Sequence, residues 1–292
     1  MAKKMISSSN ISAVIVSFNP EIDRLQSLID SLLIKVKEII IVDNSQKDFD
    51  LQSKLLSNEN LVLLSDGKNK GIAQAQNIGI LFSRDLGRDA VWMFDQDSEL
   101  GELSLEVMVE ELNSFGDMVA SIGPTIVNSF NGKVEIPKKR AKCNNGCFSV
   151  DQIIASGSLT PIDIFERVGM MEEDFFIDAV DFEWCWRARS KGYAILISSQ
   201  KMTHSVGEGD ETFLGGLVSI KVASPFRLYY QVRNYITLLD RSYVPVRWKV
   251  RNLVFYFIKY FYFGFGRSDS AAYRCNIYSG FRDGMRMRAN KR

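Results

Sequence analysis

Ala90-Val-Trp-Met-Phe-Asp-Gln-Asp-Ser98 is the stretch that decides the predicted fold, because an apolar run ends in it at two carboxylates one residue apart. The run is too short for a helix of its own and is rich in strand-forming residues, so it predicts a buried strand. Asp95 and Asp97 then lie at the carboxyl end of that strand. In open α/β sheets this end is where ligands bind, and both side chains could reach one ligand there.

Asp95 and Asp97 allow two interpretations. Two close carboxylates repel each other unless positive charge lies between them, and a hard divalent cation with oxygen ligands is the common solution. The alternative is that both residues form a turn or cap a helix in the segment 98–101. For an arbitrary Asp-x-Asp pair, the turn or cap is the better interpretation. The choice between a cation site and a turn therefore depends on the surrounding sequence.

Strand and helix patterns alternate around this stretch. Near-continuous apolar strands separated by helices are typical of a parallel sheet buried on both faces. Right-handed crossovers bring the strand ends to one rim, for which a nucleotide is the natural ligand. The predicted strands are 11–18, 36–42, 61–64 and 91–94, the predicted helices are 21–34 and 71–82, and the polar rim residues are Asn19, Asp43, Asp66, Asn69, Asp95 and Asp97.

The loop Asp66-Gly-Lys-Asn-Lys-Gly71 precedes one of these helices and could offer backbone donors to a phosphate. The alternative is a glycine-assisted turn with Asn capping, which is the better interpretation of the loop alone. The chain has neither a Walker loop nor a Gly-x-Gly-x-x-Gly motif after its first strand. A mononucleotide triphosphatase or an NAD site therefore lacks its usual signature.

The sheet is expected to continue beyond residue 100, with a polar excursion over 124–150 that resembles a hairpin flap. Ser156-Gly-Ser158 has small side chains that would let a ligand approach the backbone. The four cysteines show no zinc-type pairing and are expected to be reduced thiols of a cytosolic protein without a signal peptide. The further elements are a helix over 104–112 and strands over 118–123, 153–159 and 194–197.

A second acidic cluster contains Asp178 and Asp181, with a helix predicted from Asp178 onward. Capping the helix explains Asp178 completely. Capping explains Asp181 less well, because placing a carboxylate among Phe176, Phe182 and Trp184 costs free energy unless the carboxylate has a function or an ion-pair partner.

Three further ionisable residues need an interpretation. Glu183 and Arg187 are expected to form a surface ion pair one helical turn apart. His204 is the only histidine of the chain, and a lone histidine is usually a hydrogen-bonding partner and nothing more. As a third ligand beside Asp95 and Asp97, its imidazole would suit Mn²⁺ or a softer divalent ion.

Charge is distributed unevenly along the chain. From Arg241 onward, twelve Lys and Arg against two acids give +10, while the preceding residues have 24 against 33, giving −9. This basic tail contains an apolar, aromatic run over 253–265, which is too short for a bilayer span of roughly 20 residues. The run suits an anionic lipid surface, and a core helix or a dimer contact is the equal alternative. No nucleic-acid recognition motif accompanies the tail, so nucleic acid is not an expected partner.

Seven motifs, taken together, resemble family 2 glycosyltransferases of the GT-A fold, and most closely the bacterial rhamnosyltransferase branch. The resemblance covers Ile11 to Asn234 and implies an α/β fold with a mostly parallel central sheet. It divides the chain into a nucleotide-sugar-binding and catalytic domain, 1–222, and a C-terminal helical extension, 223–292. The motifs are Val16-Ser-Phe-Asn-Pro20; Val42-Asp-Asn-Ser45; Asn69-Lys-Gly-Ile-Ala73 with Asn77 and Gly79; Asp95-Gln-Asp97; Asp174-Phe-Phe-Ile-Asp-Ala-Val-Asp181; His204 with Gly207; and Tyr230-Gln-Val-Arg-Asn234.

The resemblance implies a role for each of these residues. Asp43 would hydrogen-bond the pyrimidine base, and Asp95 would approach the ribose or the water shell of a metal. Asp97 would bind the divalent cation, Mg²⁺ or Mn²⁺, with His204 as a further ligand. The remaining nucleotide-sugar-binding residues would be Phe18, Asn19, Asn44, Asn69, Gly71, Ala73, Asn77, Gln96 and Arg233.

The resemblance also implies an inverting reaction. Asp181 falls where the family has its catalytic base, and Asp178 is a rival because Val180 replaces the usual Glu before Asp181. General-base assistance of this type contributes roughly 10²–10⁴-fold in rate. A cation that bridges the diphosphate would stabilise the leaving group.

The expected donor is dTDP-L-rhamnose, with a UDP-sugar as the open alternative. The expected acceptor is a glycan, lipid-linked as in O-antigen or capsule synthesis, which would make the enzyme peripheral on the inner face of the cell membrane. Two competing functions are a catalytically silent nucleotide-sugar-binding subunit and a phosphatase of the haloacid dehalogenase type. The segment Ser98-Glu-Leu100 fits that phosphatase poorly.

Overall fold

The computed structural model describes residues 5–128, 132–135, 137, 140–143, 146–204, 210–213, 218–221, 223–265 and 270–290. The helices are α1 (Ile22–Leu33), α2 (Gly71–Asp85), α3 (Leu105–Ser114), α4 (Ile162–Val168), α5 (Val180–Ser190), α6 (Pro225–Leu238), α7 (Val246–Phe265) and α8 (Ser270–Asn290). The strands are β1 (Ile11–Ser17), β2 (Glu38–Asp43), β3 (Leu61–Ser65), β4 (Ala90–Asp95), β5 (Val119–Asn128), β6 (Val134–Glu135), β7 (Arg140–Lys142), β8 (Phe148–Val150), β9 (Leu159–Pro161), β10 (Ala194–His204), β11 (Asp210–Phe213) and β12 (Val218–Lys221).

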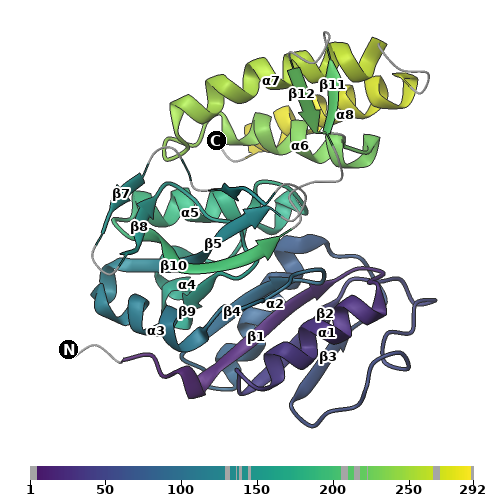
Figure 1. Cartoon of the computed structure of the whole chain (residues 1–292). Coiled ribbons are helices and arrows are strands. Elements are labelled where there is room, and N and C mark those ends of the chain that lie inside the picture. The colour runs from purple at the N-terminus through teal and green to yellow at the C-terminus, as the bar shows by residue number, and fades with distance from the viewer. Residues whose placement is uncertain are drawn as a thin grey trace.

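One large mixed sheet runs through the molecule in the order β3-β2-β1-β4-β9-β5-β10-β8-β7 (Figure 1). The first four of these strands are mutually parallel. In the register, Ser17 lies opposite Asp43, Asp43 opposite Ser65, and Val16 opposite Asp95. The carboxyl ends of the four strands therefore meet at one edge, which confirms the predicted rim.

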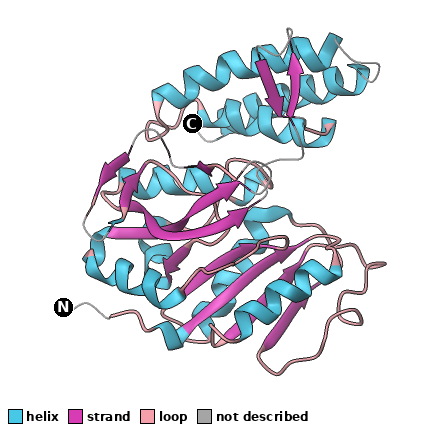
Figure 2. Cartoon of the chain, in the orientation of Figure 1, coloured by secondary structure: helices cyan, strands magenta, loops and turns pink. Residues whose placement is uncertain are grey.

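Helices cover both faces of the sheet (Figure 2). Side chains alternate along β1, so that Ala13 and Ile15 join one hydrophobic cluster while Val14 joins the other. The first cluster includes residues of α1 and α3, and the second includes residues of α2, α4 and α5. Because both faces are covered, the strands are apolar at nearly every position.

The predicted strand over 153–159 is wrong for most of its length. Only β9, Leu159–Pro161, is extended, and it lies antiparallel between β4 and β5. The preceding residues form a turn in which Gly157 has a φ of +78°. This turn packs on β4, because Gly157 N–H donates to Met93 O at 2.7 Å and Met93 N–H donates to Ser158 O at 2.9 Å.

The three C-terminal helices pack together through a small hydrophobic cluster of their own (Figure 1). Gly280 and Gly284 of α8 allow close contact with α6, because a Cβ atom would lie 2.5 Å from Tyr229 O or 2.7 Å from Arg233 O. No helix in the described ranges combines the length and hydropathy of a membrane span. The four cysteines are free thiols, as expected.

Candidate active site

The exits of β1 and β4 are joined at the rim. Phe18 N–H donates to Gln96 Oε1 at 2.6 Å, and Gln96 Nε2 donates back to Phe18 O at 3.3 Å. The next residue, Asn19, has a φ of 45°, and its N–H donates to Ser45 Oγ at 2.7 Å. Gln96 thus holds the Phe18–Asn19 turn, and the ring of Phe18 remains exposed beside it.

Asp43 is buried at the end of β2, and one of its carboxylate oxygens already accepts three hydrogen bonds. Its Oδ1 accepts from Ser17 Oγ at 2.9 Å, Ser45 Oγ at 2.6 Å and Ser45 N–H at 3.1 Å. These three donors hold the carboxylate in a single orientation. The geometry leaves Oδ2 as the oxygen that can accept a hydrogen bond from a ligand.

Asn44 connects the end of β2 to the beginning of α2. Its Nδ2 donates to Gly71 O at 3.1 Å and its Oδ1 accepts from Lys70 N–H at 3.3 Å. Asn69 Oδ1 accepts from Gly71 N–H at 2.9 Å. The predicted turn is therefore present and is closed by the Asn69 side chain, whereas the N-cap residue of α2 is Lys70, which makes no side-chain cap.

The first turn of α2 also contacts the acidic loop that precedes α5. Ile72 N–H donates to Phe176 O at 2.6 Å, and Ala73 N–H points at the same oxygen at 3.4 Å. A Cβ atom at Gly71 would lie 2.5 Å from the Phe176 ring, and Gly71 has a φ of +81°. The helix terminus that could offer donors to a phosphate binds this carbonyl in the structure, which links α2 to the loop before α5.

Asn77 has a connecting role in the structure. Its Nδ2 donates to Met171 O at 3.0 Å and to Glu173 Oε1 at 2.9 Å, while its Oδ1 accepts from Met171 N–H at 2.9 Å. Both amide hydrogens are engaged in holding the segment before α5 on α2. A contact between Asn77 and the nucleotide stays a prediction.

Asp95 and Asp97 follow β4 at the rim, and the Asp97 side chain is exposed. Their oxygens suit a hard divalent cation, which commonly keeps water and substrate oxygens as its other ligands. In the described parts of the chain, no group of three or more His, Cys, Asp or Glu side chains converges on a metal position. A cation held by these two acids would therefore take further ligands from the donor and from water.

The end of β10 runs beside the Asp97 turn. Glu99 and Thr203 form an isolated antiparallel bridge, so His204 follows a residue that is paired with this turn. His204 is the last residue of β10, and its backbone pairs with Asn128. The side chain of His204 lies outside the described part of the structure, and its role as a metal ligand stays a prediction.

Asp181 lies half-buried in the first turn of α5. Burial raises the pKa of its carboxyl group to about 7, and the negative charge of Asp95 adds to this rise. Hydrogen bonds from the backbone of Phe182, at 2.8 Å, and of Ala155 oppose it. The charges of Asp181 and Asp95 therefore interact, and a carboxyl group with a pKa near neutrality can take up a proton at physiological pH.

Asp178 has a different environment from Asp181. Its two oxygens accept from Arg227 Nε at 3.3 and 3.1 Å, and Oδ1 accepts from Arg227 Nη2 at 3.1 Å. The helix begins at Val180, and Asp178 does not cap it, since the residue before the helix is Ala179 in the left-handed region. The Arg227 guanidinium therefore holds the Asp178 carboxylate and ties this loop to α6.

The loop between residues 174 and 179 is strained and is held from α6. Phe176, Asp178 and Ala179 all have positive φ values, which cost free energy in residues other than glycine. The fully buried Asn234 Nδ2 lies 3.0 Å from Phe175 O, 2.8 Å from Ile177 O and 2.9 Å from Asp178 O.

Arg233 supports the same loop from α6. Its Nη2 donates to Phe175 O at 2.9 Å and to Asp174 O, and its guanidinium lies 4.6 Å from the centre of the Tyr230 ring. Sequence reasoning placed Arg233 at the nucleotide and gave no role to Asn234. The structure shows both side chains binding the loop that presents Asp178, and the signal in the sequence was the Tyr230-Gln-Val-Arg-Asn234 motif.

The expectation of a surface ion pair between Glu183 and Arg187 is wrong, because the pair is buried. Arg187 Nε donates to Glu183 Oε1 at 2.8 Å, and Nη2 donates to Oε2 at 2.9 Å. Tyr243 donates to the same carboxylate at 2.5 Å, and Arg187 also donates to the carbonyls of Val168 and Met170. The pair therefore joins α5 to α4 and to the segment after α6, where packing excludes water.

A cavity of about 480 Å³ opens beside Asp178, between the start of α5, α6 and α7. Trp248 and Tyr256 contribute aromatic side chains to its wall, and Arg251 and Lys259 contribute cations. Aromatic faces together with hydrogen-bond donors suit a polar organic ligand. Asp178 and Phe182 line the cavity, which places it next to the first turn of α5.

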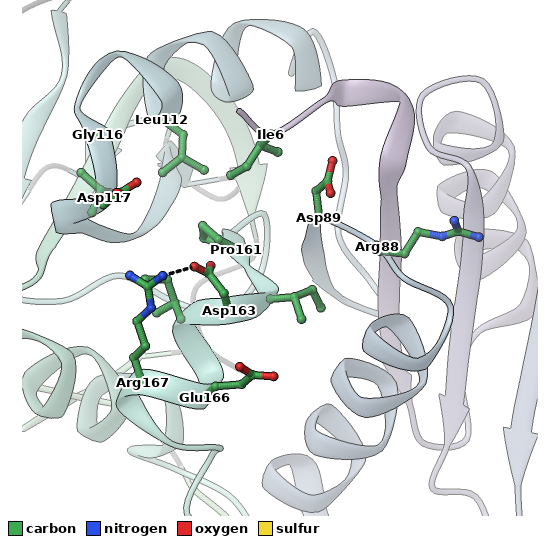
Figure 3. Close-up of a pocket in the computed structure, with 13 residues that line it drawn as sticks. Ile6, Arg88, Asp89, Leu112, Gly116, Asp117, Pro161, Asp163, Glu166 and Arg167 are labelled. Atoms are coloured by element: carbon green, nitrogen blue, oxygen red, sulfur yellow. Dashed lines mark hydrogen bonds and ion pairs between the residues drawn. The ribbon is translucent and has the colours of Figure 1, made fainter. Parts of the chain in front are cut away.

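A second cavity, of about 380 Å³, lies at the opposite end of β4 (Figure 3). Asp89 lines it and directly precedes β4, whereas Asp95 is the last of the six residues in that strand. Six strand residues span about 20 Å. Asp163 and Arg167 form an exposed ion pair in its wall, and the cavity is separate from the rim.

The chain matches known proteins over most of its length. Residues 12–173 match the family model described as glycosyl transferase family 2. The chain is 34% identical over 263 residues to the dTDP-rhamnosyl transferase RfbF of Shigella flexneri, covering 85% of this chain and 86% of that protein. It is 26% identical over 205 residues to the low-salt glycan biosynthesis hexosyltransferase Agl10 of Haloferax volcanii, covering 64% of each.

Solved structures share the fold at low sequence identity. A crystal structure of GalNAc-T7 with UDP, GalNAc and Mn²⁺ has a TM-score of 0.59 and 15% identity, covering 97% of this chain and 57% of that one. Residues 1–349 of S. aureus TarS give a TM-score of 0.53 and 14% identity, covering 94% and 80%. The expected GT-A fold is thereby confirmed. The family match and the curated relatives together show that this chain belongs to glycosyl transferase family 2.

Proposed function

We propose that this glycosyltransferase is an inverting, metal-dependent rhamnosyltransferase that moves L-rhamnose from dTDP-L-rhamnose to a hydroxyl group of a glycan. The observation that carries the proposal is the Asp181 carboxyl group, half-buried at the rim, with its pKa raised to about 7. Similarity to the dTDP-rhamnosyl transferase RfbF supports the choice of donor.

The donor binds along the rim in this proposal. Asp43 Oδ2 accepts a hydrogen bond from the pyrimidine ring, since Oδ1 is already occupied by Ser17 and Ser45. Phe18 and Asn19 lie beside the pyrimidine ring. Asp97 and Asp95, with His204 as a further ligand, would hold a divalent cation, which when bound supplies Lewis-acid stabilisation of the diphosphate leaving group.

Asp181 acts as the general base. Its carboxylate takes the proton from the acceptor hydroxyl, whose oxygen attacks the anomeric carbon from the face opposite the diphosphate. The carbon–oxygen bond to the diphosphate breaks as the new glycosidic bond forms, so the configuration inverts without a covalent enzyme intermediate. Asp178 is bound by Arg227 and, with Arg233 and Asn234, positions the loop.

The acceptor sugar occupies the cavity beside Asp178, where aromatic side chains and cations surround it. We further propose that this acceptor is lipid-linked and belongs to cell-surface polysaccharide synthesis, so that transfer takes place at the inner face of the cell membrane. The sugar-accepting hydroxyl then enters between α5 and α7, and the lipid remains outside.

The test compares Asp181→Asn and Asp178→Asn with a matched control, Asp163→Asn, which removes an exposed carboxylate far from the rim. Thermal shift with dTDP-L-rhamnose, UDP-glucose and either Mg²⁺, Mn²⁺ or EDTA measures donor binding, and product formation measures transfer. We expect Asp181→Asn to retain donor binding and to lose transfer about 10²–10⁴-fold.

Near-normal transfer by Asp181→Asn would show that the base is assigned wrongly and would direct attention to Asp178. Donor binding without turnover in every form, the unsubstituted chain included, would instead support a silent nucleotide-sugar-binding subunit. Equal stabilisation by the donor with EDTA and with cations would contradict the metal dependence.

A further inference from the structure

The helix α7 presents one apolar face to solvent. Its exposed apolar side chains recur every three or four residues, which places them on one side of a helix. Phe257 is 65% exposed and Leu253 is 58% exposed, while Phe263 is fully buried in the cluster shared with α6 and α8. The exposed members are Val246, Val250, Leu253, Val254, Phe257, Tyr260, Phe261 and Phe265.

The aromatic members of this α7 face contact one another. The rings of Phe257 and Phe261 have centroids 4.8 Å apart, and those of Tyr260 and Phe261 are 5.4 Å apart. Phe261 and Phe265 follow at 6.1 Å. These rings form a continuous apolar surface along the second half of α7.

The charges around the α7 face are basic. The sequence of α7 contains no Asp or Glu, and Arg247 and Arg251 are exposed. Arg247 directly follows the exposed Val246, whereas Arg251 also lines the cavity beside Asp178. Residues 241–292 carry twelve Lys and Arg against two acids. Basic residues beside exposed aromatic and aliphatic side chains are the composition of helices that lie in the headgroup region of anionic membranes.

We propose that the α7 face binds flat on an anionic bilayer surface. The helix has twenty residues, about 30 Å of length in the plane of the membrane. A second copy of this chain is the rival occupant, but it would bring two strongly basic segments together. An anionic surface attracts the same segments, so charge favours lipid over self-association.

The geometry connects this surface to the acceptor, and this step depends on the proposed function. Phe255 and Tyr256, on the inner side of α7, line the cavity beside Asp178. A bilayer on the outer face of α7 would therefore lie one helix diameter, about 10 Å, from that cavity. An acceptor sugar on a lipid could reach the cavity without the lipid leaving the membrane.

The test is flotation of the full chain with vesicles of phosphatidylcholine alone and of equal parts phosphatidylcholine and phosphatidylglycerol. Phe257→Ser with Phe261→Ser should lower the partition coefficient on anionic vesicles at least tenfold. The matched control is Ile34→Ser with Leu56→Ser, two exposed apolar residues that lie between α1 and β3 in the sequence, and it should bind like the unsubstituted chain. Arg247→Gln should lower anionic binding about fivefold.

Three outcomes would overturn the proposal. These are equal binding to both vesicle types, no binding to either, and a loss of dimer in light scattering when Phe257 and Phe261 become Ser. Donor binding, measured by thermal shift on the same variants, should be unchanged. A failure of vesicle binding with intact donor binding would refute only the membrane surface, whereas a failure of donor binding in the unsubstituted chain would refute the proposed function.

Discussion

Replacing Asp181 with Asn should stabilise the protein at pH 8 while it removes transfer. The Asp181 carboxyl group has an ordinary pKa of 3.8 and a pKa of about 7 in the folded chain, chiefly because it is buried. The folded state therefore binds this proton more tightly than the unfolded state. Asn has nearly the same shape and never ionises, so it avoids the free-energy cost of the buried charge.

The sign and size of the effect follow from the two pKa values. Below pH 3.8 the carboxyl group is neutral in both states, and Asp181→Asn should change stability little. Between pH 3.8 and 7 the unfolded state ionises first, so the stability of the unsubstituted chain falls as pH rises. Above pH 7 the difference in stability between the unsubstituted chain and Asp181→Asn is constant. It is about 4 kcal/mol at most, because the folded and unfolded pKa values differ by about three. For a chain of this length that is ~6 °C at most in Tm.

The assay is thermal unfolding of the unsubstituted chain, Asp181→Asn and the control Asp163→Asn at pH 5 and pH 8, with EDTA present so that no cation lowers the pKa. Asp181→Asn should raise the free energy of unfolding by about 2 kcal/mol at pH 5 and by about twice that at pH 8. An equal rise in the free energy of unfolding at both pH values, or no rise at pH 8, would refute the conclusion that burial raises the pKa of this carboxyl group. Asp163→Asn, which removes an exposed carboxylate, controls for a general effect of replacing Asp with Asn.

Three further predictions concern the rim and its support. Because Asp181 must be ionised to act as base, kcat/KM should fall tenfold per pH unit below the pKa of Asp181; a pH–rate profile should show this break below pH 7, because the cation needed for transfer lowers that pKa. Asn234→Leu removes the amide donor that three loop carbonyls share, so kcat should fall at least tenfold with little change in donor KM. Glu183→Gln removes the partner of buried Arg187 and should lower the free energy of unfolding by about 3 kcal/mol in a urea titration.

The sequence by itself determined the sheet and its rim. Apolar runs that end in polar residues identify strands and their exits, and the parallel order then brings Asp43 and Asp95 to one edge. Both patterns are local, because a strand's period and the polarity of its end are properties of a few consecutive residues. The turn at Asn69 before α2 also depends only on a few consecutive residues, and the structure contains this turn.

Only the tertiary structure decided which partner each polar side chain has. Asp178 and Arg227 are 49 residues apart in the sequence and form an ion pair, and Asn77 and Met171 are 94 residues apart. No local pattern specifies such pairs, since they depend on how α6 and α2 pack against the loop before α5. The same packing buries Glu183 and Arg187, which the helical period alone placed at the surface, and it turns one side of α7 toward solvent.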